Sequence, residues 1–264
     1  MNIRTYIAFF KLSIKDYLAY FKDYLLSTFG RIILYTLMIF VWNIVYVSSH
    51  ITSIAGFSLV DINAYFVIGG AAFFLINSIN DNILSDDIKT GSISRELIKP
   101  THYPLMVFIQ SLADNILVVP PVLIVIILAI HLLGLSITLL EIVGFVATLI
   151  IGYFIINLIQ FMIGSFAIYT TSALGFSILS FNIMSILGGA IMPLSFFPSY
   201  ISNITSILPF QFFIYLPTSI LLGLTPPSAY IHYITLGIIW LLGIAIVTYL
   251  FWGRVKKKLS TAGG

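Results

Sequence analysis

The sequence predicts an all-α membrane protein with six transmembrane helices, an amphipathic helix before the first and a re-entrant helical hairpin before the last. Of 264 residues, 60% are hydrophobic and 8% are charged, and the mean hydropathy is +1.11. A water-exposed globular surface cannot tolerate that composition. The Lys and Arg residues fall into three clusters, separated by charge-poor stretches. These stretches are long enough for the ~20 helical residues that cross a hydrocarbon core of about 30 Å. Residues 1–264 are therefore predicted to form a single transmembrane domain.

Residues 1–29 are predicted to form an interfacial elbow helix rather than a span. Apolar residues recur at helical spacing from Ile3 to Leu25, and basic residues fall on another face. This pattern is typical of a helix that lies in the membrane interface with its ammonium groups toward anionic lipid. It would equally serve a cytoplasmic helix packed on a partner protein. The basic residues of the second face are Arg4, Lys11, Lys15 and Lys22.

Six apolar segments are predicted to cross the membrane. The first two contain no charged residue, and the stretch from Ile142 to Gly253 contains none either. We divide that long stretch at its Gly, Pro and polar positions, which interrupt helices. The predicted spans are residues 32–49, 62–80, 115–135, 142–169, 174–192 and 232–252.

The distribution of basic residues predicts the orientation in the membrane. An even number of spans places both termini on the same side, and the positive-inside rule makes that side cytoplasmic, together with the link at residues 85–104. The expected exterior loops near residues 50–61, 133–141 and 193–231 contain no Lys or Arg. The N-terminus lacks the short apolar core of a cleavable signal peptide. We therefore expect a multi-pass protein of the plasma membrane.

The segment at residues 193–230 is too apolar for a solvated loop and too often interrupted by proline for a span. Residues 200–208 and 210–222 are long enough for two short helices. Irregular backbone at membrane depth persists only where protein or a water-lined cavity satisfies it. We therefore predict a re-entrant hairpin that dips from the exterior face. The alternative is a different division of the chain, into six or eight spans.

The order of these elements resembles the permease subunits of ABC-2 type transporters. In the link, KTGSISRELIKP places Gly91, Leu97 and Pro100 as in that family's Gly-x-x-x-x-x-Leu-x-x-Pro pattern. One difference is Ser92-Ile93, where members often carry Thr-Leu. In the hairpin, the residues that fall as in family members are Pro193, Phe197, Pro198, Pro209, Phe210, Pro217 and Gly223.

The resemblance implies that the link is a coupling helix, which docks in a groove of a cytoplasmic ATPase. Its charges offer both signs for interface pairing, and Ile88, Ile93 and Leu97 offer apolar anchors. Gly91 permits a turn and Pro100 ends the helix. The alternative is a solvated loop whose charges keep it in water. The expected coupling residues are Asp86, Asp87, Lys89, Gly91, Arg95, Glu96, Leu97, Lys99 and Pro100.

The chain is not expected to be an enzyme or the ATPase, because it contains no G-x-x-x-x-G-K-[ST] phosphate loop. By resemblance, the transporter contains two permease chains, identical or related, and two ATPase subunits that bind ATP and Mg²⁺. We expect contact with the lipid bilayer and none with nucleic acid, since the basic residues follow the sides of the bilayer. We also expect no cofactor or metal in this chain, since its four His residues lack ligand spacing and it has no Cys.

Polar residues within the predicted spans are candidates for a translocation path between paired subunits. They lie on one face of the fourth span and one face of the fifth. Helix packing is the alternative, because small residues and interhelical amides commonly hold membrane helices together. The candidates are Asn157, Gln160, Gly164, Asn182, Ser185 and Gly189.

The scarcity of charges deep within the spans argues against an ion-coupled mechanism. We therefore expect a permease that exports an amphipathic or hydrophobic cargo, such as a drug, a lipid or a peptide-like molecule. The alternative is a secondary transporter or channel that needs no ATPase, although we find no convincing internal repeat. An intramembrane enzyme or an assembly factor is a further alternative, but the sequence lacks a recognisable catalytic motif.

Overall fold

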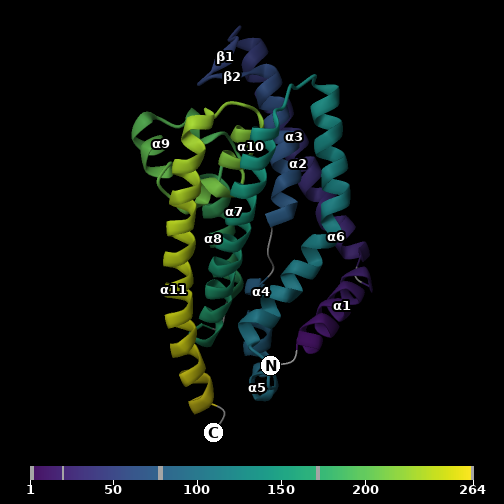
Figure 1. Ribbon diagram of the computed structural model, residues 1–264, viewed down its shortest axis with the longest axis vertical. Helices are drawn as coiled ribbons and strands as arrows, with labels where there is room; N and C mark the ends of the chain where they lie inside the picture. The colour runs from purple at the N-terminus through teal and green to yellow at the C-terminus, as the bar shows by residue number, and fades with distance from the viewer. Residues whose placement is uncertain (1–2, 20, 77–79, 171–172, 263–264) are drawn as a thin grey trace.

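The computed structural model describes residues 3–19, 21–76, 80–170 and 173–262, and the chain forms a bundle of long helices (Figure 1). Its α-helices are α1 (Ile3–Ala19), α2 (Phe21–Ser48), α3 (Leu59–Ile76), α4 (Asn80–Lys89), α5 (Ile93–Ile98), α6 (Tyr103–Leu132), α7 (Leu139–Ser165), α8 (Ala173–Leu187), α9 (Ser199–Thr205), α10 (Tyr215–Leu221) and α11 (Tyr230–Ala262). The antiparallel strands β1 (Ser53–Ile54) and β2 (Phe57–Ser58) pair with each other. The 3₁₀ turns are η1 (Phe166–Ile168), η2 (Leu194–Phe196), η3 (Pro209–Phe212) and η4 (Pro227–Ala229).

Five helical segments of the described chain are long and apolar enough to cross a membrane. The prediction of an all-α membrane protein is therefore confirmed, whereas the number of six spans is not. The predicted fifth span, residues 174–192, corresponds to α8, which has only 15 residues. At 1.5 Å per residue it rises about 22 Å, which is short of the hydrocarbon thickness. The five segments are Thr28–Ser48, Leu59–Lys89, Tyr103–Leu132, Leu139–Ile168 and Pro227–Leu259.

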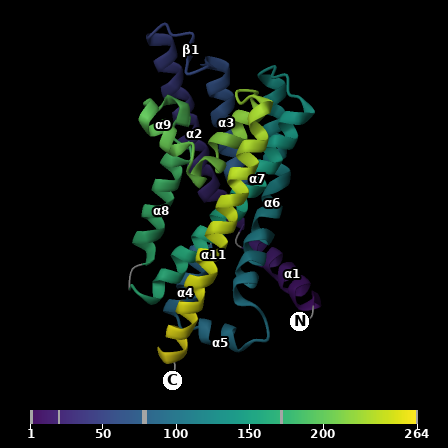
Figure 2. The same ribbon diagram turned by 60° about the vertical axis from the view of Figure 1, so that its left-hand side comes forward.

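The link and the two chain ends lie at one end of the bundle. Helix α1, helix α5 and the last turns of α11 are together at that end in both views (Figure 1 and Figure 2). The β1–β2 hairpin, the α6–α7 connection and α9 lie at the opposite end. We call these the link end and the hairpin end. The termini and the link, which are predicted to share one side of the membrane, thus share one end of the bundle.

The predicted elbow begins as a separate helix but is shorter than expected. Helix α1 ends at Ala19, and the last part of the predicted range 1–29 already belongs to α2. Helix α1 packs along α6, and the amide of His102 donates a 3.2 Å hydrogen bond to the hydroxyl of Tyr6. Its apolar residues Ile3 and Ile7 are exposed. The helix therefore has one side on the protein and apolar side chains available to lipid.

Two short helices form at the positions predicted for the hairpin, α9 and α10. Pro198 precedes α9, Pro209 begins η3 and Gly223 follows α10 with φ +67°. Proline fits the start of a helical element, where its missing N–H is not needed, and glycine tolerates positive φ at the end. Pro193 likewise precedes η2, while Pro217 lies in the first turn of α10. Phe197 follows η2 and Phe210 lies within η3.

The inner part of this segment is buried because glycines let three long helices approach it closely. A Cβ added at Gly152 of α7 would collide with the carbonyl oxygen of Phe212. A Cβ at Gly69 of α3 would lie 2.9 Å from Ile214, and one at Gly237 of α11 would lie 2.8 Å from the Phe212 ring. Both Phe212 and Ile214 are almost fully buried. Segment η3–α10 is thus wedged among α3, α7 and α11.

Candidate functional site

The link consists of two short helices joined by a tight turn. Helix α4 ends at Lys89, Gly91 has φ +73°, and helix α5 begins at Ile93. A positive φ favours glycine, as expected for the turn at this position. Lys99 leaves α5 in an extended conformation, with ψ 143°, which suits a residue before proline. Pro100 therefore follows the helix end, as predicted.

The predicted coupling residues divide between the two helices. Asp86, Asp87 and Lys89 lie in the last turn of α4, and Arg95, Glu96 and Leu97 lie in α5. Charged side chains on the outer surface of the link carry both signs. Glu96 forms a 2.6 Å ion pair with the Lys99 ammonium group, which is about half exposed. The exposed charged residues are Asp86, Lys89, Arg95 and Lys99.

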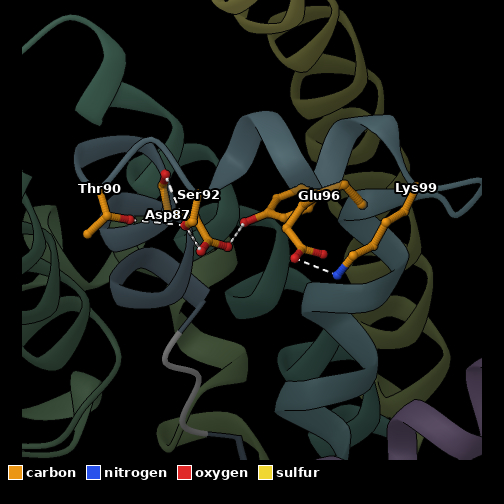
Figure 3. Close-up of polar contacts among 6 residues, drawn as sticks. Asp87, Thr90, Ser92, Glu96 and Lys99 are labelled. Atoms are coloured by element: carbon orange, nitrogen blue, oxygen red, sulfur yellow. Dashed lines mark hydrogen bonds and ion pairs between the residues drawn. The ribbon is translucent and has the colours of Figure 1, made fainter.

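Asp87 accepts hydrogen bonds from within the chain (Figure 3). Its Oδ1 accepts a 2.5 Å hydrogen bond from the Ser92 hydroxyl, and its Oδ2 accepts a 2.7 Å hydrogen bond from the Tyr103 hydroxyl. The hydroxyls of Thr90 and Ser92 lie 3.0 Å apart. The carboxylate therefore ties the end of α4 to the turn and to the start of α6. Asp87 thus has a positioning role within the chain, and its expected pairing with a partner's charge stays a prediction.

A row of aromatic side chains connects the link to two long helices. The Tyr103 ring stacks on Trp252 of α11 with centroids 5.7 Å apart, and Trp252 meets Phe161 of α7 edge to face at 5.1 Å. All three side chains are buried, in a cluster that also contains Leu84 and Ile93. Such aromatic contacts add to the stabilisation from burial. The link is consequently packed on α7 and α11 as well as on α6.

The apolar anchors predicted for a partner's groove are partly wrong. Ile93 is 1% exposed and belongs to the chain's own core, so it is not available to a partner. Ile88 and Leu97 pack against the same cluster and are half-buried. Ile98 is 84% exposed, and sequence reasoning missed it. Adjacent residues of an α-helix point about 100° apart, so Ile98 lies on a different side of the short helix from Leu97.

The polar stripe of the fourth span faces the protein interior. A Cβ at Gly164 would lie 2.8 Å from the Asp81 carbonyl oxygen, so this glycine allows α4 and α7 to touch. Asn157 is 2% exposed and donates a 2.8 Å hydrogen bond to the Tyr153 carbonyl. Gln160 is also buried. For Gly164, this geometry favours helix packing over a translocation path.

The three path candidates of the predicted fifth span lie in different environments. Asn182 is exposed on α8 and donates a 2.8 Å hydrogen bond to the Ile178 carbonyl. Gly189 lies beyond the end of α8, with φ +89°, and its carbonyl accepts a 2.7 Å hydrogen bond from Tyr65. Ser185 is half-buried between them. The structure therefore does not gather the six candidates of the two stripes into one cavity.

A cavity of about 780 Å³ lies between α6, α7 and α11, towards the link end. Of the six path candidates, Asn157 lines it. The other lining residues are mostly aromatic, aliphatic or basic, and sequence reasoning did not assign them a common site. Within the described residues, no group of three or more His, Asp or Glu side chains is arranged to hold a metal ion.

The model of a protein family described as "ABC-2 family transporter protein" matches residues 32–263, from within α2 to the end of α11. No curated protein and no solved structure matches the chain.

Proposed function

Because the chain belongs to the ABC-2 family of transporter proteins, we propose that it is the permease subunit of an ABC exporter that moves an amphipathic or hydrophobic cargo outward. ATP and Mg²⁺ bind to a separate ATPase subunit in this proposal, and two such subunits serve a pair of permease chains. The observation that carries the proposal is the structured link. It lies at the end of the bundle where both chain ends lie (Figure 1 and Figure 2), and it exposes both charged and apolar side chains.

The outer face of α5 has the composition of a docking surface. Ile98 offers an exposed apolar side chain, and Arg95 and the Glu96–Lys99 pair surround it with charge of both signs. A central apolar residue within a polar rim is the common arrangement of protein interfaces. Charged groups at the rim favour a correctly oriented partner over others. We therefore place the ATPase contact on this face of the link.

The inner side of the link supplies a mechanical connection. Asp87 holds Tyr103, and Tyr103 stacks on Trp252. A displacement of α5 by the ATPase would therefore move the adjoining ends of α6 and α11 with it. Packed interiors transmit such displacements because they have few voids to absorb them. This route joins ATP hydrolysis outside the bilayer to movement of the helices within it.

The second permease chain is proposed to pack on α8. This helix is too short to span alone and exposes large apolar residues around the amide of Asn182. In a membrane, an amide on an apolar helix face promotes association because lipid cannot hydrogen-bond to it. A neighbouring chain, identical or related, would provide that partner.

The distribution of basic residues determines the orientation that we propose for the chain in the membrane. The link end, which holds α5 and the basic last turns of α11, is placed in the cytoplasm, and both termini lie there. The apolar side chains of α1 then meet the cytoplasmic membrane interface. The hairpin end faces the exterior of the plasma membrane, with η3–α10 re-entering from that side.

The proposal is tested by purifying the tagged chain from its native membrane in mild detergent. We expect a nucleotide-binding ATPase subunit to co-elute, and its recovery to fall when Ile98 is replaced by Ser. Recovery should stay unchanged for Tyr200→Phe, which alters an exposed residue of α9 at the hairpin end. Reconstituted vesicles containing both subunits should move a hydrophobic probe only with ATP. Transport sustained by an ion gradient in the absence of ATP would instead indicate a secondary transporter.

A further inference from the structure

The cavity between α6, α7 and α11 has apolar aromatic walls. Phe108 and Phe154 stack with centroids 5.4 Å apart on one side, and Phe161 and Trp252 meet at 5.1 Å on another. Leu241 lines the cavity further along α11. The volume of about 780 Å³ falls in the range of sites for small organic ligands. These walls suit a hydrocarbon chain.

One end of the same cavity is basic. Arg254, Lys256 and Lys257 line it from the last turns of α11, and His102 lines it from the start of α6. No Asp or Glu is among the described residues that line the cavity. Arginine and lysine at this depth attract anionic lipid headgroups. The cavity thus combines an apolar body with an end that attracts negative charge.

A polar group lies between the two regions without a partner. Thr248 is 6% exposed and lines the cavity, and its hydroxyl has no hydrogen-bond partner within the described chain. Leaving a buried hydroxyl unsatisfied is costly, so a ligand that brought a polar atom to this position would satisfy it. Thr248 is six residues before Arg254 on the same helix, about 9 Å along its axis. The cavity therefore offers separate positions for the polar linkage region and the charged headgroup of a lipid.

We propose that this cavity binds one anionic phospholipid of the surrounding bilayer. Its phosphate lies at Arg254 and Lys256, its ester region reaches Thr248, and an acyl chain follows the aromatic walls toward Leu241. Free phosphate would leave those walls facing water, which is why the proposal commits to a lipid. It goes beyond the transport proposal, because binding of this lipid requires neither the ATPase nor cargo.

Trp252 reports directly on the site. The chain contains three tryptophans, and replacing Trp42 and Trp240 by Phe leaves Trp252 in the cavity wall. This variant, in phosphatidylcholine nanodiscs, is titrated with phosphatidylglycerol whose acyl chains are brominated. We expect saturable quenching of Trp252 at a mole fraction at least about five-fold lower than for brominated phosphatidylcholine with the same chains.

Two sets of variants in this background assign the quenching to the cavity. The double change Arg254→Gln with Lys256→Gln should abolish the preference for phosphatidylglycerol. The matched change Lys258→Gln should keep it, because Lys258 lies over the Tyr169 ring, outside the cavity lining. Ala245→Phe fills the cavity and should weaken quenching by both lipids, whereas Ile246→Phe, on the outer face of α11, should not.

Three results would overturn the proposal. The first is equal half-saturation for the two lipids in the Trp252 reporter. The second is a preference for phosphatidylglycerol that survives the Arg254 and Lys256 double change, whose exposed positions leave the fold intact. The third is loss of the preference when millimolar inorganic phosphate is added, since that would show a simple anion site. None of these results depends on ATP, so they leave the permease proposal unaffected.

Discussion

The hydroxyl of Tyr103 donates a 2.7 Å hydrogen bond to Oδ2 of Asp87, and this bond joins the last turn of α4 to the first residue of α6. Between the two residues lies the whole of helix α5. The bond therefore closes the link at its base, while the stacking of Tyr103 on Trp252 fixes that base to α11. The part of the chain proposed to meet the ATPase is thus a braced element rather than a free loop.

Tyr103→Phe removes this hydrogen bond and keeps the aromatic ring in place. Hydrogen bonds to charged groups stabilise by about 1.5–3 kcal/mol, and the partial exposure of Asp87 favours the lower end. We expect faster amide hydrogen exchange across residues 87–102, by up to about ten-fold, with little change in the remaining helices. Tyr200→Phe removes an exposed hydroxyl at the hairpin end and should change nothing. Equal exchange in the two variants would show that the bond does not close the link.

Ile98 and Ile93 are expected to respond differently to truncation. Ile93→Ala leaves a cavity in the cluster around Leu84 and should lower the free energy of unfolding by about 3 kcal/mol. Ile98→Ala should leave thermal stability unchanged and weaken ATPase binding by about ten-fold, as for a central interface residue. Thermal unfolding and ATPase pull-down of the same preparations separate the two effects. A loss of stability with Ile98→Ala would place this residue in the fold and not at an interface.

Arg95 and Glu96 test whether the charges of α5 serve the partner. The Glu96–Lys99 pair is partly exposed, so breaking it with Glu96→Gln should cost less than about 1 kcal/mol of stability. We expect Glu96→Gln and Arg95→Gln to reduce ATP-driven transport severalfold while expression and unfolding temperature stay constant. Lys11→Gln changes a charge on α1 and is the control. A secondary transporter would tolerate all three substitutions.

The sequence was sufficient to predict the helical membrane fold, because composition and charge-free length reflect the bilayer directly. It also located the turn at Gly91 and the helix end before Pro100, where backbone chemistry is local. It did not separate Ile93 from Ile98, because a helix of six residues is too short for its buried side to appear as a periodic pattern.

The remaining site features depend on contacts between distant segments. Packing of α4, α6 and α11 is what brings Asp87, Tyr103 and Trp252 together. A residue pattern along the sequence does not reveal such contacts between distant segments. Arg254, Lys256 and Lys257 form the basic end of the cavity. In the sequence they served only to predict the orientation of the chain in the membrane. The tyrosine and proline that open α6 were visible, but they gave no indication of the carboxylate partner.

Asn182→Leu is expected to weaken association between permease chains. The amide sits on the exposed apolar face of α8, and interhelical hydrogen bonds in membranes contribute about 0.6–2 kcal/mol. The dimer fraction in nanodiscs or detergent should therefore shift by about three- to thirty-fold in dissociation constant. Asn203→Leu removes an exposed amide from α9 and should leave pairing unchanged. If Asn182→Leu left the dissociation constant unchanged, the interface between permease chains would lie on another helix face.

Gly152→Ala tests whether the wedge at η3–α10 depends on close helix approach. The new Cβ would meet the backbone carbonyl of Phe212, which cannot rotate away as a side chain could. Either α7 or the buried segment must shift, and overpacking of this kind costs about 1–3 kcal/mol. Gly243→Ala is the matched control, since a Cβ there has no neighbour within 4 Å. We expect a lower unfolding temperature for Gly152→Ala alone, with increased proteolysis in residues 205–222, because those residues lose their packing against α7 first. An unfolding temperature equal to that of Gly243→Ala would mean that segment η3–α10 can shift with little loss of stability. Close packing against α7 would then not hold the segment in place.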